Sequence, residues 1–278
     1  MRGASILVLV MVAFVALSAC PAPAPVGPPP PPPPPIAAVP PAPPARADGR
    51  LPALATPVSV ELAMDVDPTK TTFRGTERIV VDVPAETWHV VMHSHALAIA
   101  DARALLPSGE AVAARTSARP ANGDKGDAPE ELVITFARPL PPGRSTIALA
   151  WSGPFDGELR GLYRVQDHDA WYAFTQFEAV SARRAFPSFD EPSFKVPWTV
   201  SVTAPKGMIA VANGPEIERR DAGATTTFRF APTPPMPSYL VALAVGPFDA
   251  VPIAGLSVPG RVITVKGGKA RAAMAAEM

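Results

Sequence analysis

The feature that most limits the folds open to this chain is a two-residue alternation of apolar and polar side chains, which recurs from residue 58 to residue 202. Such alternation puts one row of side chains on each face of a strand, so that one face can be buried while the other meets solvent. The apolar rows are Val58, Val60, Leu62, Met64 and Val66; Ile79, Val81 and Val83; Leu132, Ile134 and Phe136; Ile147, Leu149 and Trp151; and Val196, Trp198, Val200 and Val202. The pattern predicts many short strands.

Helix-forming periodicity is missing from most of the chain. No stretch before about residue 268 keeps the 3.6-residue apolar period of an amphipathic helix. We therefore expect an all-β fold, built as an antiparallel β-sandwich or a saddle-shaped sheet. The last residues, KARAAMAAEM over 269–278, are good helix formers and predict the start of a helix at the C-terminus.

Composition supports a globular body without a strong net field. Hydrophobic residues make up 47% of the chain, which is enough to bury a sizeable core. Lys plus Arg and Asp plus Glu both number 25, so no net charge would draw the protein onto a nucleic acid. We expect no nucleic-acid partner.

The amino terminus has the pattern of an export signal. Arg2 precedes an apolar run from Ile6 to Leu17, which is shorter than the roughly 20 residues that a membrane-spanning helix needs. The run closes with Leu17-Ser18-Ala19-Cys20, which resembles a bacterial lipobox, where the signal is cut before the cysteine and the thiol receives a lipid. We predict a signal peptide over 1–19 and an exported lipoprotein of the cell envelope, bound to the membrane through Cys20. An ordinary signal peptide with an incidental cysteine is the alternative.

A proline-rich segment follows the cysteine. Residues 20–50 are rich in proline and alanine and include eight consecutive prolines, Pro28–Pro35. Such a segment lacks backbone donors and favours the extended polyproline II conformation, which suits a tether. The alternative is a proline-rich ligand for the aromatic groove of a partner.

The stretch from Trp171 to Pro192 holds the most informative polar residues. If it begins as a strand, Gln176 and Glu178 lie on one face, an arrangement that on pattern alone is typical of a solvated edge. Paired charges then surround a proline-containing corner, and we expect them to brace it while nearby aromatic rings anchor it in the core. The charged residues are Arg183, Arg184, Asp190 and Glu191, and the aromatic ones are Phe186, Phe189 and Phe194.

Two motifs in this stretch carry a family resemblance. TQFEA at 175–179, followed by ARRAFPSFDEPSFK at 182–195, resembles the N-terminal domain of zinc metallopeptidases (gluzincins) related to aminopeptidase N. The resemblance extends from about residue 51 to about residue 269. It implies a β domain over 51–265 and the start of a catalytic domain at 266–278, the rest of which is missing from this sequence. Ser188 stands where many relatives carry a cysteine.

The resemblance also implies a role for two of these residues. Gln176 and Glu178 match positions whose side chains, in relatives, hold the free α-ammonium of a peptide substrate. An ammonium offers three donors, and a carboxylate with an amide oxygen supplies acceptors and the countercharge. Such a clamp would restrict cleavage to single N-terminal residues of peptides with a free N-terminus.

The metal-binding motif of that family is not in this sequence. The family's zinc site needs H-E-x-x-H and a distal glutamate, and no such motif can be assembled from His89, His93, His95 and His168. We therefore expect the chain alone to be inactive, with zinc bound elsewhere in the complete enzyme. His93 and His95 would share a face if 90–99 were a strand, which leaves a metal pair as a minor alternative to two surface histidines.

The sequence thus predicts the N-terminal part of an exported zinc aminopeptidase, which contributes a β domain and the wall of the substrate pocket that binds the α-amine. Two rivals stay open: a lipid-tethered β module that serves only binding or scaffolding, and a pseudoenzyme. The reading frame downstream of this sequence distinguishes them.

Overall fold

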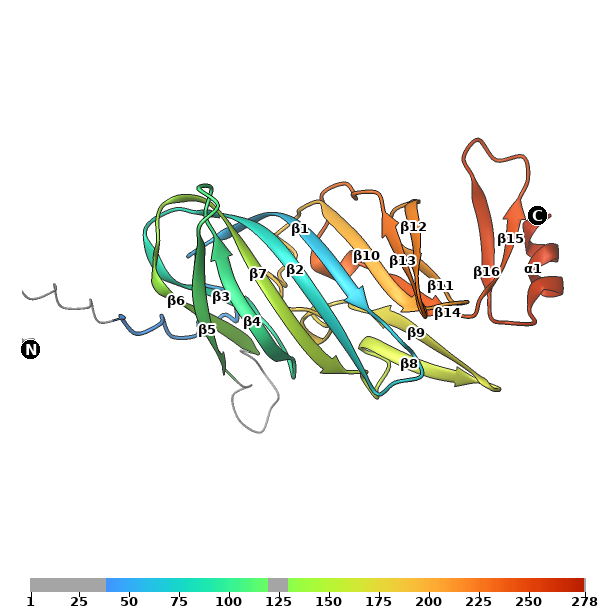
Figure 1. Cartoon of the computed structure of the whole chain (residues 1–278), viewed down its shortest axis with the longest axis horizontal. Helices are drawn as coiled ribbons and strands as arrows, with labels where there is room; N and C mark the ends of the chain where they lie inside the picture. The colour runs from blue at the N-terminus through green and yellow to red at the C-terminus, as the bar shows by residue number, and fades with distance from the viewer. Residues whose placement is uncertain (1–38, 120–129, 278) are drawn as a thin grey trace, which may run out of the picture. The chain divides into compact units, whose positions relative to one another are not determined.

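Strands dominate the computed structural model, which describes residues 39–119 and 130–277 (Figure 1). Within these residues the only α-helix is α1 (Lys269–Ala276), at the C-terminus where a helix was expected. No helix in this part of the chain has the length and apolar character needed to cross a bilayer. The all-β prediction is confirmed.

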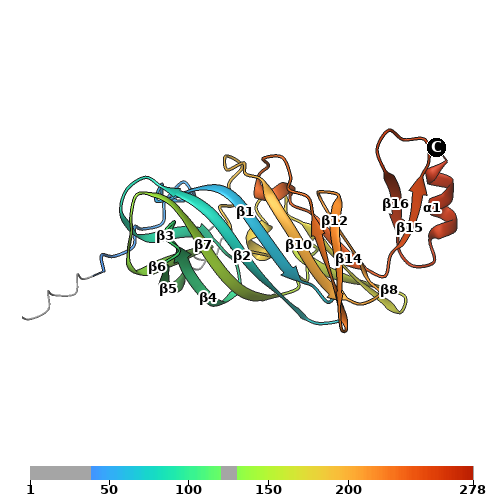
Figure 2. The same cartoon turned by 45° about the horizontal axis from the view of Figure 1, so that its top comes forward.

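The largest sheet has ten strands in the order β12-β13-β10-β1-β2-β7-β4-β5-β6-β3. Its strands are β1 (Thr56–Asp65), β2 (Thr72–Val83), β3 (Thr87–His93), β4 (Ala98–Leu105), β5 (Ala111–Arg119), β6 (Glu131–Leu140), β7 (Gly143–Pro154), β10 (Trp198–Pro205), β12 (Glu216–Ala222) and β13 (Thr225–Phe230). Figures 1 and 2 both show β1, β2 and β7 running side by side, with β10 next to β1.

One pair in this sheet departs from the antiparallel prediction. β1 and β10 run parallel, with Val60 opposite Trp198 and Leu62 opposite Val200, whereas the other neighbours are antiparallel. More than 130 residues separate these two strands in sequence, which is ample for the crossover connection that parallel strands require. The sheet is therefore mixed, where an antiparallel one was expected. The difference was not predictable because the alternation of side chains carries no information on strand direction.

Two smaller sheets complete the β structure. The first has the order β11-β14-β9-β8, and the second pairs β15 with β16, against which α1 packs. Their strands are β8 (Gly161–Asp167), β9 (Ala170–Gln176), β11 (Ile209–Ala212), β14 (Leu243–Gly246), β15 (Asp249–Ile253) and β16 (Gly260–Thr264). Two short 3₁₀ helices, η2 (Ala182–Arg184) and η3 (Ser238–Leu240), lie in the connections.

Burial follows the alternation that predicted the strands. In β2, Ile79, Val81 and Val83 are buried, while Arg78 and Asp82, which point to the other face, are exposed. The buried rows of β1, β2, β7 and β10 join one core with the aromatic side chains of the 177–198 region. The core therefore supports the stretch that carries the candidate site.

The N-terminal predictions fall partly outside the described residues. The signal peptide, Cys20 and Pro28–Pro35 all lie in residues 1–38, which the structure does not describe. Residues 39–50, the last part of the predicted tether, lie against the β domain, and the Pro40 carbonyl oxygen is 2.9 Å from His89 Nε2.

Candidate functional site

Gln176 is the last residue of β9, a strand held on both sides by hydrogen-bonded neighbours. Gln176 pairs with Gly161 of β8, and Ala173 pairs with Val245 of β14. Beyond the ladder, the Thr175 hydroxyl accepts a hydrogen bond from the Leu243 amide at 3.0 Å and donates to the Leu243 carbonyl at 3.3 Å. The end of β9 is thus tied to β14 by a side chain.

Glu178 lies beyond the strand rather than on it. The chain turns after Gln176, and the Ser181 amide donates to the Phe177 carbonyl at 2.8 Å. The expectation that Gln176 and Glu178 share a strand face is therefore wrong, because β9 ends at Gln176 and the chain turns from Phe177 onward. The peptide bond between Glu178 and Ala179 is cis.

Both side chains are nevertheless open to solvent. Gln176 and Glu178 are exposed, and neither side chain makes a hydrogen bond or ion pair with any residue in the described ranges. A carboxylate and an amide that are two residues apart and free of internal partners can bind an external donor. The arrangement offers acceptors without requiring an existing contact to break.

Aromatic side chains fix the segment that presents them. The Phe186 ring lies 5.5 Å from the rings of both Phe177 and Trp198. The Phe189 and Phe194 rings are also 5.5 Å apart, in an edge-to-face arrangement. Phe186 and Phe189 are buried and Phe194 is partly buried, so the predicted anchoring role of these three residues is confirmed.

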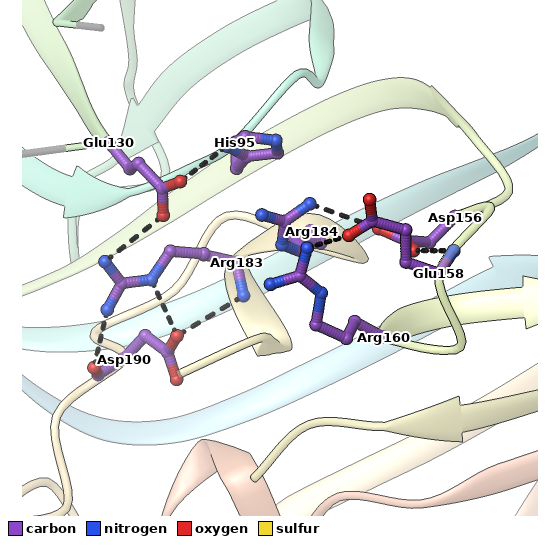
Figure 3. A network of polar contacts seen from close by, with 8 residues as sticks. All are labelled: His95, Glu130, Asp156, Glu158, Arg160, Arg183, Arg184 and Asp190. Carbon is purple, nitrogen blue, oxygen red and sulfur yellow. Dashed lines mark hydrogen bonds and ion pairs between the residues drawn. The ribbon is translucent and has the colours of Figure 1, made fainter. Parts of the chain in front are cut away.

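An ionic network centred on Arg183 braces the same segment (Figure 3). Arg183 is 6% exposed, and its Nε donates to Asp190 Oδ2 at 2.9 Å. Its Nη1 lies 3.6 Å from Glu130 Oε2, and His95 Nδ1 lies 2.6 Å from the other oxygen of Glu130. Asp190 also accepts a hydrogen bond from the Ser238 hydroxyl at 2.5 Å. The predicted bracing by Arg183 and Asp190 is confirmed.

Arg184 and Glu191 have partners other than each other. Arg184 Nη1 lies 3.1 Å from Asp156 Oδ2, and the Glu158 amide donates to the same carboxylate at 2.7 Å (Figure 3). Glu191 Oε1 accepts a hydrogen bond from the Leu51 amide at 2.7 Å. Sequence analysis missed Glu130, Asp156 and Ser238 as members of these networks, since no local pattern connects them with the corner.

The two histidines considered as a metal pair do not form one. β3 ends at His93 and β4 begins at Ala98, so the continuous strand that would align His93 with His95 does not exist. His93 is 1% exposed, contrary to the expected surface position, and burial lowers its pKa to about 4, with the Arg183 cation acting in the same direction and Asp190 opposing. His95 already has a partner, because its Nδ1 lies 2.6 Å from Glu130 Oε1.

The residues present do not fit a zinc site. Residues 39–119 and 130–277 contain no group of three or more His, Cys, Asp or Glu side chains placed to hold a metal. The full sequence contains no H-E-x-x-H. We therefore assign no step to a metal held by this chain.

Comparison with known proteins places this geometry in context. The family model described as Peptidase M1 N-terminal domain matches residues 56–240, a span that includes β9, Gln176, Glu178 and the braced corner. Aminopeptidase M1-D from Oryza sativa subsp. japonica is 34% identical over 224 residues, which make up 79% of this chain and 24% of that protein. Aminopeptidase N from Acetobacter pasteurianus is 34% identical over 215 residues, covering 74% of this chain and 57% of that protein.

A human relative matches over a similar region. Endoplasmic reticulum aminopeptidase 1 from Homo sapiens is 30% identical over 225 residues, or 76% of this chain and 24% of its own length. This chain thus spans about a quarter of the length of the rice and human relatives.

Proposed function

The chain belongs to the family described by the Peptidase M1 N-terminal domain, and from this membership we propose that it is the β domain of an exported, zinc-dependent aminopeptidase that removes N-terminal residues from peptides. The observation that carries the proposal is the position of two exposed acceptors, Gln176 and Glu178, within the matched span. The zinc ligands of the complete enzyme would come from residues other than those of this chain.

In this proposal Glu178 and Gln176 bind the α-ammonium of the substrate. Glu178 supplies a negative charge and Gln176 an amide oxygen, and together they can accept the three N–H donors of an ammonium. The aromatic anchors and the Arg183 network hold the segment next to the acceptors, so that segment does not have to be ordered when the substrate arrives.

Kinetics of Glu178→Ala in the complete enzyme test the clamp. A charge-assisted hydrogen bond contributes about 1.5–3 kcal/mol, so kcat/KM should fall about 10- to 150-fold on substrates with a free amino terminus. Residual activity on N-acetylated substrates should barely change, because those substrates carry no ammonium. Glu86→Ala, which removes an exposed carboxylate outside the corner, is the matched control. Equal losses on both substrate classes would instead make Glu178 a structural residue.

We further propose that the protein is anchored in the bacterial cell envelope by a lipid on Cys20. The support is the Leu17-Ser18-Ala19-Cys20 motif and the absence of any other cysteine from the sequence. Each buried methylene of an acyl chain contributes about 0.8 kcal/mol, so two or three chains hold a protein firmly on a bilayer. Cys20→Ala should move the protein from the membrane fraction to the soluble fraction, and retention of the variant on membranes would refute lipidation.

A further inference from the structure

The last part of the proline-rich segment contacts side chains of β3 and β5 on one side of the strands β3, β6 and β5. We call residues Val39–Arg50 the strap, and we call this side of the three strands the strap face. The side chains of the strap face that carry the argument are His89, Arg119, Glu131 and Thr135.

Two side chains of the strap face donate hydrogen bonds to backbone carbonyls of the strap. His89 Nε2 lies 2.9 Å from the Pro40 oxygen, and Arg119 Nη2 donates to the Pro43 oxygen. A carbonyl can only accept, so His89 carries its proton on Nε2 and its Nδ1 accepts from the Thr135 hydroxyl, 3.0 Å away. The Thr135 hydroxyl can donate or accept, so it is compatible with the proton on Nε2 that the Pro40 carbonyl requires.

The Arg119 guanidinium is held in place by an ion pair with Glu131. Its Nη1 donates to Glu131 Oε2 at 2.7 Å, and Glu131 is only 1% exposed. A nearly inaccessible carboxylate is costly unless a cation is paired with it, and Arg119 is that partner. The pair directs one guanidinium N–H toward the strap.

The donors match the chemistry of a proline-rich ligand. Proline has no backbone N–H, and an extended proline-rich segment forms no internal hydrogen bonds, so it presents carbonyl acceptors that need donors. We propose that the strap face is a binding site for an extended proline-rich segment, recognised through its carbonyls, and that the chain fills this site with its own strap.

Burial on β6 supports a built site. Leu132, Ile134 and Phe136 face the core, yet Glu131, Val133 and Thr135 on the opposite face are also buried. A strand at the surface of a sheet would leave that second row in solvent. On β6 this row belongs to the strap face, where Glu131 and Thr135 hold the two donors that bind the strap.

The strap also connects with the corner that carries the candidate clamp. Directly after the strap, the Leu51 amide donates to Glu191 in the corner at 2.7 Å. Any tether formed by the preceding residues would therefore end at about residue 38, and docking removes roughly 35 Å of its reach at about 3.1 Å per residue.

Spin labelling of the full chain tests the strap. Cys20→Ser removes the single cysteine of the sequence, and Val39→Cys places a nitroxide at the start of the strap. We expect a restricted spectrum that becomes mobile in concentrated guanidinium chloride. His89→Leu combined with Arg119→Met should mobilise the label without unfolding, whereas Arg138→Met, at an exposed arginine of β6 paired with Glu110, should leave it restricted.

Circular dichroism distinguishes release of the strap from unfolding. If the double variant does not fold, Arg119→Met alone takes its place. A label that is as mobile in the native chain as in denaturant would overturn the proposal, and so would a folded variant whose label stays restricted.

Discussion

Glu77 is a buried carboxyl in the middle of β2, at a position where alternation would place an apolar side chain. It is 2% exposed, and neither oxygen has a hydrogen-bond partner in the described part of the chain. Its neighbours across the ladder are Leu62 on β1 and Leu149 on β7. Burial therefore raises the pKa of Glu77 well above its usual value, because the charged form is poorly solvated.

The sign of the resulting pH dependence follows from proton binding. Below the ordinary glutamate pKa, the folded and unfolded states both hold the proton on Glu77. As the pH rises above that value, the unfolded chain loses the proton while the folded chain keeps it up to its raised pKa. The free energy of unfolding therefore falls over this window, and unfolding becomes more favourable with rising pH.

Glu77→Leu should stabilise the protein, and by more at pH 8 than at pH 5. An unsatisfied buried polar group costs about 1–3 kcal/mol, which the leucine side chain avoids. Urea denaturation at the two pH values measures the difference. Glu61→Leu, on the exposed face of β1, is the control and should change stability little at either pH. An equal gain at both pH values would contradict a protonated Glu77.

Arg183 provides a second test at the scale of single residues. Its partner Asp190 has a side chain only 1% exposed, so Arg183→Met leaves a buried carboxylate without its cation. Loss of one member of a buried pair costs about 3–5 kcal/mol. Arg144→Met breaks an exposed pair with Asp82 and should cost less than about 1 kcal/mol. Similar costs for the two variants, measured by denaturant unfolding, would show that the Arg183 network does not brace the corner.

At the scale of elements, the alternation predicts strands well because each buried row meets one continuous core. Val60, Leu62 and Met64 of β1 are buried as the pattern requires. The end of β9 was predicted less well, since Phe177 continues an apolar row although the chain has already turned. Its ring packs against Phe186, which is a tertiary contact that a local pattern does not contain.

The contact between β2 and β7 links the sheet to the corner and predicts the effect of a small substitution. A Cβ at Gly75 would overlap the Trp151 ring, and Trp151 Nε1 donates to the Ala185 carbonyl at 2.9 Å, so the ring has little freedom to move. Gly75→Ala should destabilise the protein by about 1–3 kcal/mol, the usual cost of overpacking.

Trp151 also supplies a readout, because its fluorescence should shift if the ring is displaced. Gly157→Ala is the matched control, since a Cβ there meets no atom within 4 Å. A Gly75→Ala variant as stable as this control would mean that the corner yields easily to movement of the ring.

At the scale of the whole molecule, the burial of alternate side chains within strands was predictable from the sequence. The contacts between segments distant in sequence were not. The candidate acceptors Gln176 and Glu178 were identified by resemblance to a family motif, whereas Glu130 and Asp156, which brace the neighbouring arginines, had no sequence signal. The strap was also missed. A proline-rich composition predicts extension, but docking depends on His89 and Arg119, which are far from it in sequence.

At the same scale, zinc binding and peptide hydrolysis distinguish this chain from a complete aminopeptidase. The 278-residue chain should bind no stoichiometric zinc and hydrolyse no aminoacyl anilide, because its sequence lacks H-E-x-x-H and its described residues contain no group of three or more His, Cys, Asp or Glu side chains that could hold a metal. Metal analysis after dialysis, with a chromogenic anilide assay, measures both properties, and a zinc aminopeptidase treated identically is the control. One tightly held zinc per chain would contradict the prediction and return attention to His93 and His95. Extension of the reading frame then separates the remaining possibilities: H-E-x-x-H followed by a distal glutamate supports an enzyme, a degenerate motif a pseudoenzyme, and a stop codon a binding module.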